Sequence, residues 1–251
     1  MAKQARKQSK RRVKDIDNDV IQIETARNKV RRNRTTSDED VRFRHQPFKP
    51  KTKNQQIMSQ LIEEMTVVVA SGPAGTGKSF TAIWKACEMF DDGRVSKIVL
   101  TRPAVEADEK LGFLPGEVDE KIAPYFVNYM DTLNRYFGKS HVDNLIRLGK
   151  IIAQPLAYIR GLTFDNSFII LDECQNVTVK QMKTFMTRIG RGSKVVVDGD
   201  IRQSDLRGEN GLQDLLNKFT ECPGFGFVNF KKEDVVRSDI VKHILDIYEP
   251  E

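Results

Sequence analysis

Short apolar runs alternate along the chain with longer stretches in which apolar residues recur at helical spacing. The runs are rich in Val, Ile and Phe and are mostly bounded by Gly, Pro, Asp or Ser, as is typical of buried strands. They predict six strands, at residues 66–70, 97–100, 151–153, 168–171, 194–197 and 226–230. The stretches between and after them predict helices at residues 79–90, 117–137, 142–148, 178–188, 211–218 and 238–248. This order predicts an α/β fold in which a mostly parallel sheet carries helices on both faces.

Residues 1–45 differ in composition from the rest of the chain. They are rich in Lys, Arg, Gln, Asn, Asp and Thr and hold few large apolar side chains, so burial cannot offset the entropy lost on ordering. We therefore expect a basic, largely disordered extension over residues 1–45 and one folded domain over residues 46–251. The 251 residues of the chain suffice for one domain with a substantial core.

The positive charge is concentrated in this extension. The whole chain has 41 Lys and Arg against 35 Asp and Glu, a net charge of +6. Residues 1–45 hold 14 of the basic and seven of the acidic residues, which leaves 27 basic against 28 acidic residues in the remainder. A basic segment of this kind favours attachment to nucleic acid, because each neutralised phosphate releases counterions. The alternative is a tail that only increases solubility.

The composition also excludes some protein classes. No apolar run reaches the roughly 18 residues that a membrane-spanning helix needs, and no apolar stretch follows the basic N-terminus as in a secretory signal. We therefore expect a cytoplasmic protein without a membrane partner. The three cysteines, Cys87, Cys174 and Cys222, lie far apart and outside any metal-ligand spacing, which indicates buried free thiols rather than disulfides or a zinc site.

Residues 72–79 have the pattern GxxxxGK[ST] between a predicted strand and a predicted helix, as a phosphate-binding loop (P-loop) does. The glycines allow a tight turn in which backbone N–H groups point into one concavity, at the positive end of the helix dipole. Lys78 would face the β- and γ-phosphates of ATP, and Ser79 would offer a hydroxyl to Mg²⁺. The residues predicted to bind nucleotide here are Gly72, Pro73, Ala74, Gly75, Thr76, Gly77, Lys78, Ser79 and Phe80. The alternative is a chance glycine-rich turn before a helix.

Two acidic residues follow the predicted strand at 168–171, at the edge of the sheet where ligands bind. Asp172 would hold Mg²⁺ through a water molecule, and Glu173 would orient or deprotonate the water that attacks the γ-phosphate. A second acidic strand end follows at residues 198–203, where Gln203 would sense the γ-phosphate. Taken alone, the first pattern also fits a strand meeting solvent, and the second a capped turn.

Together these segments resemble the PhoH-like family, whose domain is similar to the first RecA-like domain of superfamily-one helicases. The resemblance covers residues 46–248 and rests on residues 72–79, 101–104, 111–116, 155–156, 159–161, 172–176, 199–200, 203 and 234–237. It implies that Gln55 reads the adenine base and that Arg237 completes the catalytic site. It also implies that Gln175 and Gln203 contact the γ-phosphate.

The chain departs from the family pattern at two positions. Cys174 stands where the family usually has alanine, a small-for-small exchange that should leave the acids before it in place. Ser238 replaces a common histidine, which weakens any role for that neighbour but not for Arg237. The resemblance implies neither a second RecA-like domain nor an appended PIN-type nuclease domain, for which the chain has no room.

A helicase of this superfamily moves along a strand by closing two RecA-like domains around ATP, so a single domain predicts a homo-oligomer such as a ring. In that assembly Arg237 or Arg202 of one subunit would reach the γ-phosphate of its neighbour. The alternative is an Arg237 that contacts the γ-phosphate of its own chain.

We expect an ATPase that acts with single-stranded nucleic acid, and the family resemblance favours RNA over DNA. Besides the basic extension, Arg102, Lys110 and Arg160 are candidate contacts with the phosphates of the nucleic acid. The alternative for Arg102 and Arg160 is a pair with an acid of the core. The alternative for the whole protein is a slow regulatory ATPase that acts as a switch or assembly factor, and a small-molecule kinase is a third possibility.

Overall fold

The computed structural model describes residues 47–103 and 123–238, together with residues 240, 241, 244 and 247. At its centre is a six-stranded sheet in the order β3-β2-β4-β5-β1-β6, in which all neighbouring strands are parallel. The strands are β1 Val67–Ser71, β2 Lys97–Arg102, β3 Ile151–Pro155, β4 Ser167–Leu171, β5 Lys194–Gly199 and β6 Phe225–Asn229. All six predicted strands are present, with ends shifted by at most two residues.

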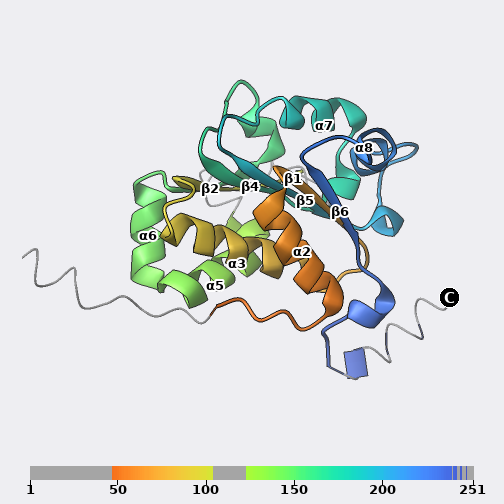
Figure 1. Ribbon diagram of the computed structural model, residues 1–251, viewed down its shortest axis with the longest axis horizontal. Helices are drawn as coiled ribbons and strands as arrows, with labels where there is room; N and C mark the ends of the chain where they lie inside the picture. The colour runs from red at the N-terminus through yellow and green to blue at the C-terminus, as the bar shows by residue number, and fades with distance from the viewer. Residues whose placement is uncertain (1–46, 104–122, 239, 242–243, 245–246, 248–251) are drawn as a thin grey trace, which may run out of the picture. The chain divides into compact units, whose positions relative to one another are not determined.

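Helices cover both faces of the sheet, which confirms the predicted layers (Figure 1). On one face lie α2 Lys53–Glu64, α3 Lys78–Asp91, α5 Val127–Phe137 and α6 Lys139–Arg147, and on the other α7 Val179–Met186 and α8 Gly211–Phe219. The 3-10 helices within the described residues are η2 Ala123–Phe126, η3 Leu156–Ile159, η4 Cys174–Asn176, η5 Ile201–Gln203 and η6 Lys232–Asp234. Residues 117–122 of one predicted helix lie outside the described residues, whereas Ile240, Val241, Ile244 and Ile247 are helical as predicted.

Helix α2 had no counterpart among the predicted helices. Its first turn is capped by the Thr52 hydroxyl, which accepts a hydrogen bond from the backbone N–H of Gln55 at 3.2 Å. Met58 and Ile62, four residues apart, are fully buried beside the sheet. A Thr three residues before a Gln is a known helix-start signal, so the sequence does contain the evidence for α2. Prolines at positions 47 and 50 lie just before this helix, and proline favours an extended backbone in the residue that precedes it.

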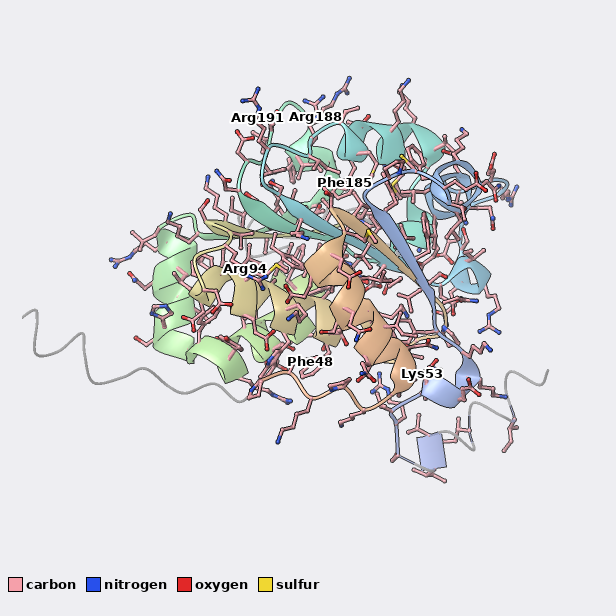
Figure 2. All side chains as sticks on the ribbon, viewed as in Figure 1. Phe48, Lys53, Arg94, Phe185, Arg188 and Arg191 are labelled. Carbon is pink, nitrogen blue, oxygen red and sulfur yellow. The ribbon has the colours of Figure 1, made fainter. Side chains whose placement is uncertain are left out.

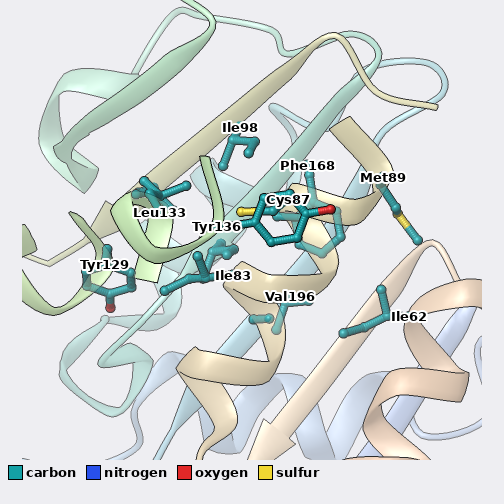
Figure 3. Packing of buried hydrophobic residues seen from close by; sticks show 14 of the residues in the cluster. Ile62, Ile83, Cys87, Met89, Ile98, Tyr129, Leu133, Tyr136, Phe168 and Val196 are labelled. Carbon is teal, nitrogen blue, oxygen red and sulfur yellow. The ribbon is translucent and has the colours of Figure 1, made fainter. Parts of the chain in front are cut away.

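The inner strands β2, β4, β5 and β1 are largely buried on both faces, and their side chains alternate between two cores. Val68 and Ala70 of β1 pack under α2 and α3, whereas Val67 and Val69 pack under α7 and α8. Figure 3 shows the first core at close range, with Ile83 and Cys87 of α3 beside Phe168 of β4. Phe185 enters the second core from α7, and Arg191 points outward beyond the end of that helix (Figure 2).

The predicted free thiols are present, although one of them is not buried. Cys87 and Cys174 are buried and Cys222 is half-buried, and none of the three forms a disulfide. Within the described ranges, no helix is long and apolar enough to cross a membrane.

Candidate nucleotide-binding site

The loop between β1 and α3 lines a cavity of about 290 Å³ at the carboxyl ends of the strands. Gly77 caps the start of α3 with a left-handed backbone, φ 81° and ψ 21°. This turn brings Lys78 and Ser79 to the first turn of the helix, where free N–H groups and the helix dipole attract anions. The lining residues are Ala74, Gly75, Gly77, Lys78, Ser79, Phe80, Ile83, Arg102, Asn128, Tyr129, Thr132, Asp172, Glu173, Gln175, Asp198, Gly199, Asp200, Gln203 and Arg237.

Lys78 lies inside the loop. Its side chain is largely buried, and its Nζ donates hydrogen bonds to the carbonyl oxygens of Gly72, at 2.8 Å, and Pro73, at 2.9 Å. Thr76 is fully buried and donates its hydroxyl to the same Pro73 carbonyl at 2.9 Å. Gly72, Pro73 and Thr76 therefore shape the loop from behind and do not line the cavity.

Position 72 requires glycine because the backbone of Phe230, just after β6, lies against it. Its φ is +131°, and a methyl group there would lie 2.2 Å from the carbonyl oxygen of Phe230. We expect Gly72→Ala to lower the free energy of unfolding by about 2–5 kcal/mol, because backbone strain adds to overpacking. Gly93→Ala is the matched control, since Gly93 also has a positive φ, +71°, with nothing within 4 Å. Chemical denaturation would measure both; equal destabilisation of the two variants would contradict the steric argument.

Gln55 does not line the cavity. It is buried behind the loop, where its Nε2 donates to the carbonyl of Thr76 at 2.9 Å and its Oε1 accepts from the N–H of Lys51 at 2.8 Å. Its amide group therefore ties the start of α2 to the P-loop, an interaction that the sequence did not predict. Adenine reading by Gln55 stays a prediction.

Asp172 and Glu173 follow β4, and both line the cavity as predicted. Glu173 has a left-handed backbone, φ 53° and ψ 37°, a conformation that costs a non-glycine residue about 1–3 kcal/mol and is common at functional sites. Its Oε2 accepts a hydrogen bond from Nε2 of Gln175 at 2.6 Å. Its Oε1 lies 3.8 Å from Nη2 of Arg102.

Arg102 lies in this cavity, at the end of β2. Besides its ion pair with Glu173, its Nη1 donates to the carbonyl of Tyr125 at 2.8 Å, and its guanidinium carbon lies 5.6 Å from the centre of the Tyr125 ring. This placement favours the alternative, a pair with an acid of the core, over contact with nucleic acid. Of the other two candidates, Arg160 is exposed away from the cavity, and Lys110 lies outside the described residues.

Asp198 had no predicted role and lies beside Asp172. Leu171 and Val197 are the last paired residues of β4 and β5, so the acids that follow them are neighbours across the two strands. Burial, reinforced by the adjacent Asp198 carboxyl, raises the pKa of Asp172 well above its usual range. Burial and the same two carboxylates also raise the pKa of the Cys174 thiol, which keeps that thiol protonated and unreactive.

Gln175 and Gln203 both line the cavity and are linked through the backbone of Asp200. The Gln175 side chain is buried, and its Oε1 accepts from the backbone N–H of Asp200 at 3.1 Å. The N–H of Gln203 in turn donates to the Asp200 carbonyl at 2.9 Å, and the exposed Gln203 side chain lines the cavity. The structure thus brings together the two glutamines that the family resemblance assigns to the γ-phosphate.

Arg237 lies over the P-loop of its own chain. The backbone N–H of Val236 donates to the carbonyl of Gly75 at 2.9 Å, and a methyl group on Gly75 would lie 2.9 Å from Nε of Arg237. Arg237 also lines the cavity. This geometry favours the alternative in which Arg237 acts on its own site, and it does not support the expectation that Arg237 reaches a neighbouring subunit.

One wall of the cavity comes from α5, for which no site role was predicted. Asn128, Tyr129 and Thr132 line it, and the buried hydroxyl of Tyr129 has no hydrogen-bond partner among the described residues. The polar residues at 128 and 132 are four apart and share a helix face. This spacing is only a weak signal of a site, because it is also typical of a helix face in contact with solvent. The half-exposed ring of Phe80 also lines the cavity, and its centre lies 5.5 Å from that of the Trp84 ring.

The residues of the cavity fit a magnesium ion. The Ser79 hydroxyl and the carboxylates of Asp172 and Asp198 are oxygen ligands of the kind that Mg²⁺ prefers. The Oδ2 atom of Asp198 is buried and has no hydrogen-bond partner in the described part of the chain. No three His, Cys, Asp or Glu side chains converge on one point in the described ranges. Water and the phosphates of a nucleotide would therefore fill the remaining positions.

Comparison with known proteins identifies the family of this chain. The family described as "PhoH-like protein" matches residues 47–249. A PhoH-like protein of Mycobacterium bovis is 44% identical over 207 residues, which are 82% of this chain and 59% of the relative. Protein PhoH of Escherichia coli strain K12 is 47% identical over 191 residues, 74% of this chain and 54% of the relative. The chain thus spans little more than half the length of these relatives.

A solved structure shares the fold at low identity. The large terminase of a thermophilic bacteriophage superposes on 79% of this chain and 50% of its own, with a TM-score of 0.50 and 12% identity. This likeness concerns the architecture alone, a RecA-like P-loop ATPase fold. The family match over residues 47–249, together with identities of 44% and 47% to the two relatives, establishes that the chain belongs to the PhoH-like family.

Proposed function

We propose that the chain binds ATP together with Mg²⁺ and hydrolyses it, as a homo-oligomeric ATPase that acts with single-stranded nucleic acid, RNA in preference to DNA. The observation that carries this proposal is the convergence of Lys78, Glu173 and Arg237 on one cavity, from three segments far apart in the sequence. Transfer of a phosphoryl group to water needs a loop that binds the phosphates, a carboxylate that orients and deprotonates the water, and a cation beside the transferred group.

The roles of the residues follow from their positions. Lys78 and the N-terminus of α3 hold the β- and γ-phosphates, and Ser79 and Asp172 hold Mg²⁺, which supplies positive charge at the phosphate oxygens. Glu173 orients the attacking water and takes its proton.

Gln175 and Gln203 contact the γ-phosphate. Arg237 stabilises the negative charge that develops there during transfer.

Oligomerisation is part of this proposal: the RecA-like domain described here offers one of the two faces between which related motors hold a strand, and a second copy of the chain would supply the other. With Arg237 assigned to its own site, Arg202 is the cation that a subunit would present to its neighbour, since its side chain is 70% exposed and it is adjacent to Gln203.

One observation favours a second candidate function, a slow ATPase switch. Hydrogen bonding to Gln175 and pairing with Arg102 engage both oxygens of Glu173, so these contacts compete with the attacking water for the carboxylate. The test is the ATPase rate with and without single-stranded RNA and DNA of equal length, together with the mass in solution. A rate that nucleic acid leaves unchanged, in a monomer, would favour the switch.

The basic extension should supply affinity for RNA rather than catalysis. Removal of residues 1–45 is expected to weaken RNA binding and to flatten its salt dependence, by about 0.7 in the log–log slope for each phosphate that is no longer neutralised. ATP turnover without RNA should stay nearly unchanged. The control is a full-length chain in which the Lys and Arg of residues 1–45 are replaced by Gln. An unchanged salt slope in both variants would place the RNA-binding surface on residues 46–251.

A further inference from the structure

Asp198 and Asp172 form an adjacent acidic pair on the floor of the cavity. The parallel register of β4 and β5 pairs Ile170 with Val196 and Leu171 with Val197, so the next residues along the two strands stand side by side. Like charges in directly opposed positions of a sheet destabilise it. Two charged carboxylates at this point would therefore be stabilised by a cation bound between or beside them.

The two side chains point to the face of the sheet that carries the P-loop helix. Side chains alternate along a strand, and Ile170 and Val196, two residues before the acids, pack in the core beneath α3. Asp172 and Asp198 thus share the face on which α3 begins with Lys78 and Ser79. All four residues line the same cavity.

Within the described ranges, neither acid forms an ion pair with a Lys or Arg of the protein. Asp198 is 1% exposed, and its Oδ2 has no hydrogen-bond partner there. Of the three cations that line the cavity, Lys78 bonds to the carbonyls of its own loop, Arg102 pairs with Glu173, and Arg237 lies beside Gly75. A buried carboxylate without a cation carries a large desolvation cost.

We propose that Asp198 is a second carboxylate for the divalent cation of this site, acting with Asp172. The inference rests on the proposed function, since the cation is the one that accompanies ATP. It goes further in one respect: two adjacent carboxylates and the Ser79 hydroxyl attract a divalent cation before any nucleotide arrives. The cation then completes its shell with water and, later, with phosphate oxygens.

The experiment measures Mn²⁺ binding to the full chain by electron paramagnetic resonance, without nucleotide and with the non-hydrolysable analogue AMP-PNP. Asp198→Asn keeps the shape and removes the charge, and we expect it to weaken Mn²⁺ binding about 10- to 100-fold, as other changes around bound metals do. Asp198→Thr is a second variant with the same expectation. Asp143→Asn, on the exposed surface of α6, is the matched control and should bind Mn²⁺ like the wild type.

Thermal unfolding provides a readout that does not depend on activity. Without metal, Asp198→Asn should unfold at the same temperature as the wild type or above it, because one of two adjacent buried carboxyl groups is replaced by a neutral amide. Added Mn²⁺ should then raise the unfolding temperature of the wild type more than that of the variant. A variant that folds normally and binds Mn²⁺ as tightly as the wild type, both with and without AMP-PNP, would overturn the proposal.

Failure of the proposed function would look different. Lys78→Ala should lose nucleotide binding and keep the nucleotide-free Mn²⁺ site, since the carboxylates remain. If the wild type binds Mn²⁺ through Asp198 but does not bind a fluorescent ATP analogue, the metal assignment stands and the ATPase proposal fails.

Discussion

Replacement of Arg237 by alanine should lower the rate of ATP hydrolysis by roughly 10³- to 10⁵-fold, the range that a transition-state arginine contributes to phosphoryl transfer. The expected cause is loss of the positive charge that lies over Gly75 in the same chain. Binding of a fluorescent ATP analogue should change far less, because Lys78 and the loop remain. Single-turnover hydrolysis and equilibrium binding measure the two effects. Arg191→Ala, at an exposed position beyond α7, is the matched control.

Assemblies of mixed subunits test whether Arg237 acts at the site of its own chain or at that of a neighbouring subunit. When Arg237→Ala subunits are combined with Glu173→Gln subunits, every site lacks one group if Arg237 acts within its own chain, so no activity should return. Recovery of turnover on mixing would show that the arginine reaches a neighbouring site, against the position that it takes beside Gly75.

Glu173→Gln should lower the hydrolysis rate by about 10²- to 10⁴-fold, the contribution of a positioned general base, and leave nucleotide affinity almost intact. Lys78→Ala should instead lose tight ATP binding, because it deletes the charge inside the loop. The same binding and single-turnover measurements separate the two defects. Equal loss of nucleotide binding in both variants, with the fold intact, would remove Glu173 from the role of handling water.

The sheet and the loop were predictable because their signals are local. Each strand is a short run of buried-type residues, such as 194–197, and burial on both faces of a parallel sheet requires such runs. The P-loop pattern fixes both the turn and the helix start within eight residues, 72–79. Helix α2 was not predicted although Thr52 and Gln55 mark its start, because Pro47 and Pro50, just before it, favour an extended chain.

The composition of the cavity was harder to predict because it depends on long-range register. Nothing in the local sequence places Asp198 beside Asp172, since only the pairing of β4 with β5 does so. The sequence left Arg102 either as a nucleic-acid contact or as the partner of an acid, and its position at the end of β2, adjacent to β4, brings it to Glu173. The same holds for Arg237, whose own-chain placement follows from the bond between Val236 and Gly75.

The left-handed backbone of Glu173 has a consequence for how this position can change over evolution. Glycine would adopt that conformation without strain and would favour the folded state, whereas β-branched residues would be disfavoured most. Selection for stability alone would therefore remove the carboxylate from the strand end. The role that we propose for Glu173 and the stability of the fold therefore oppose each other at this position.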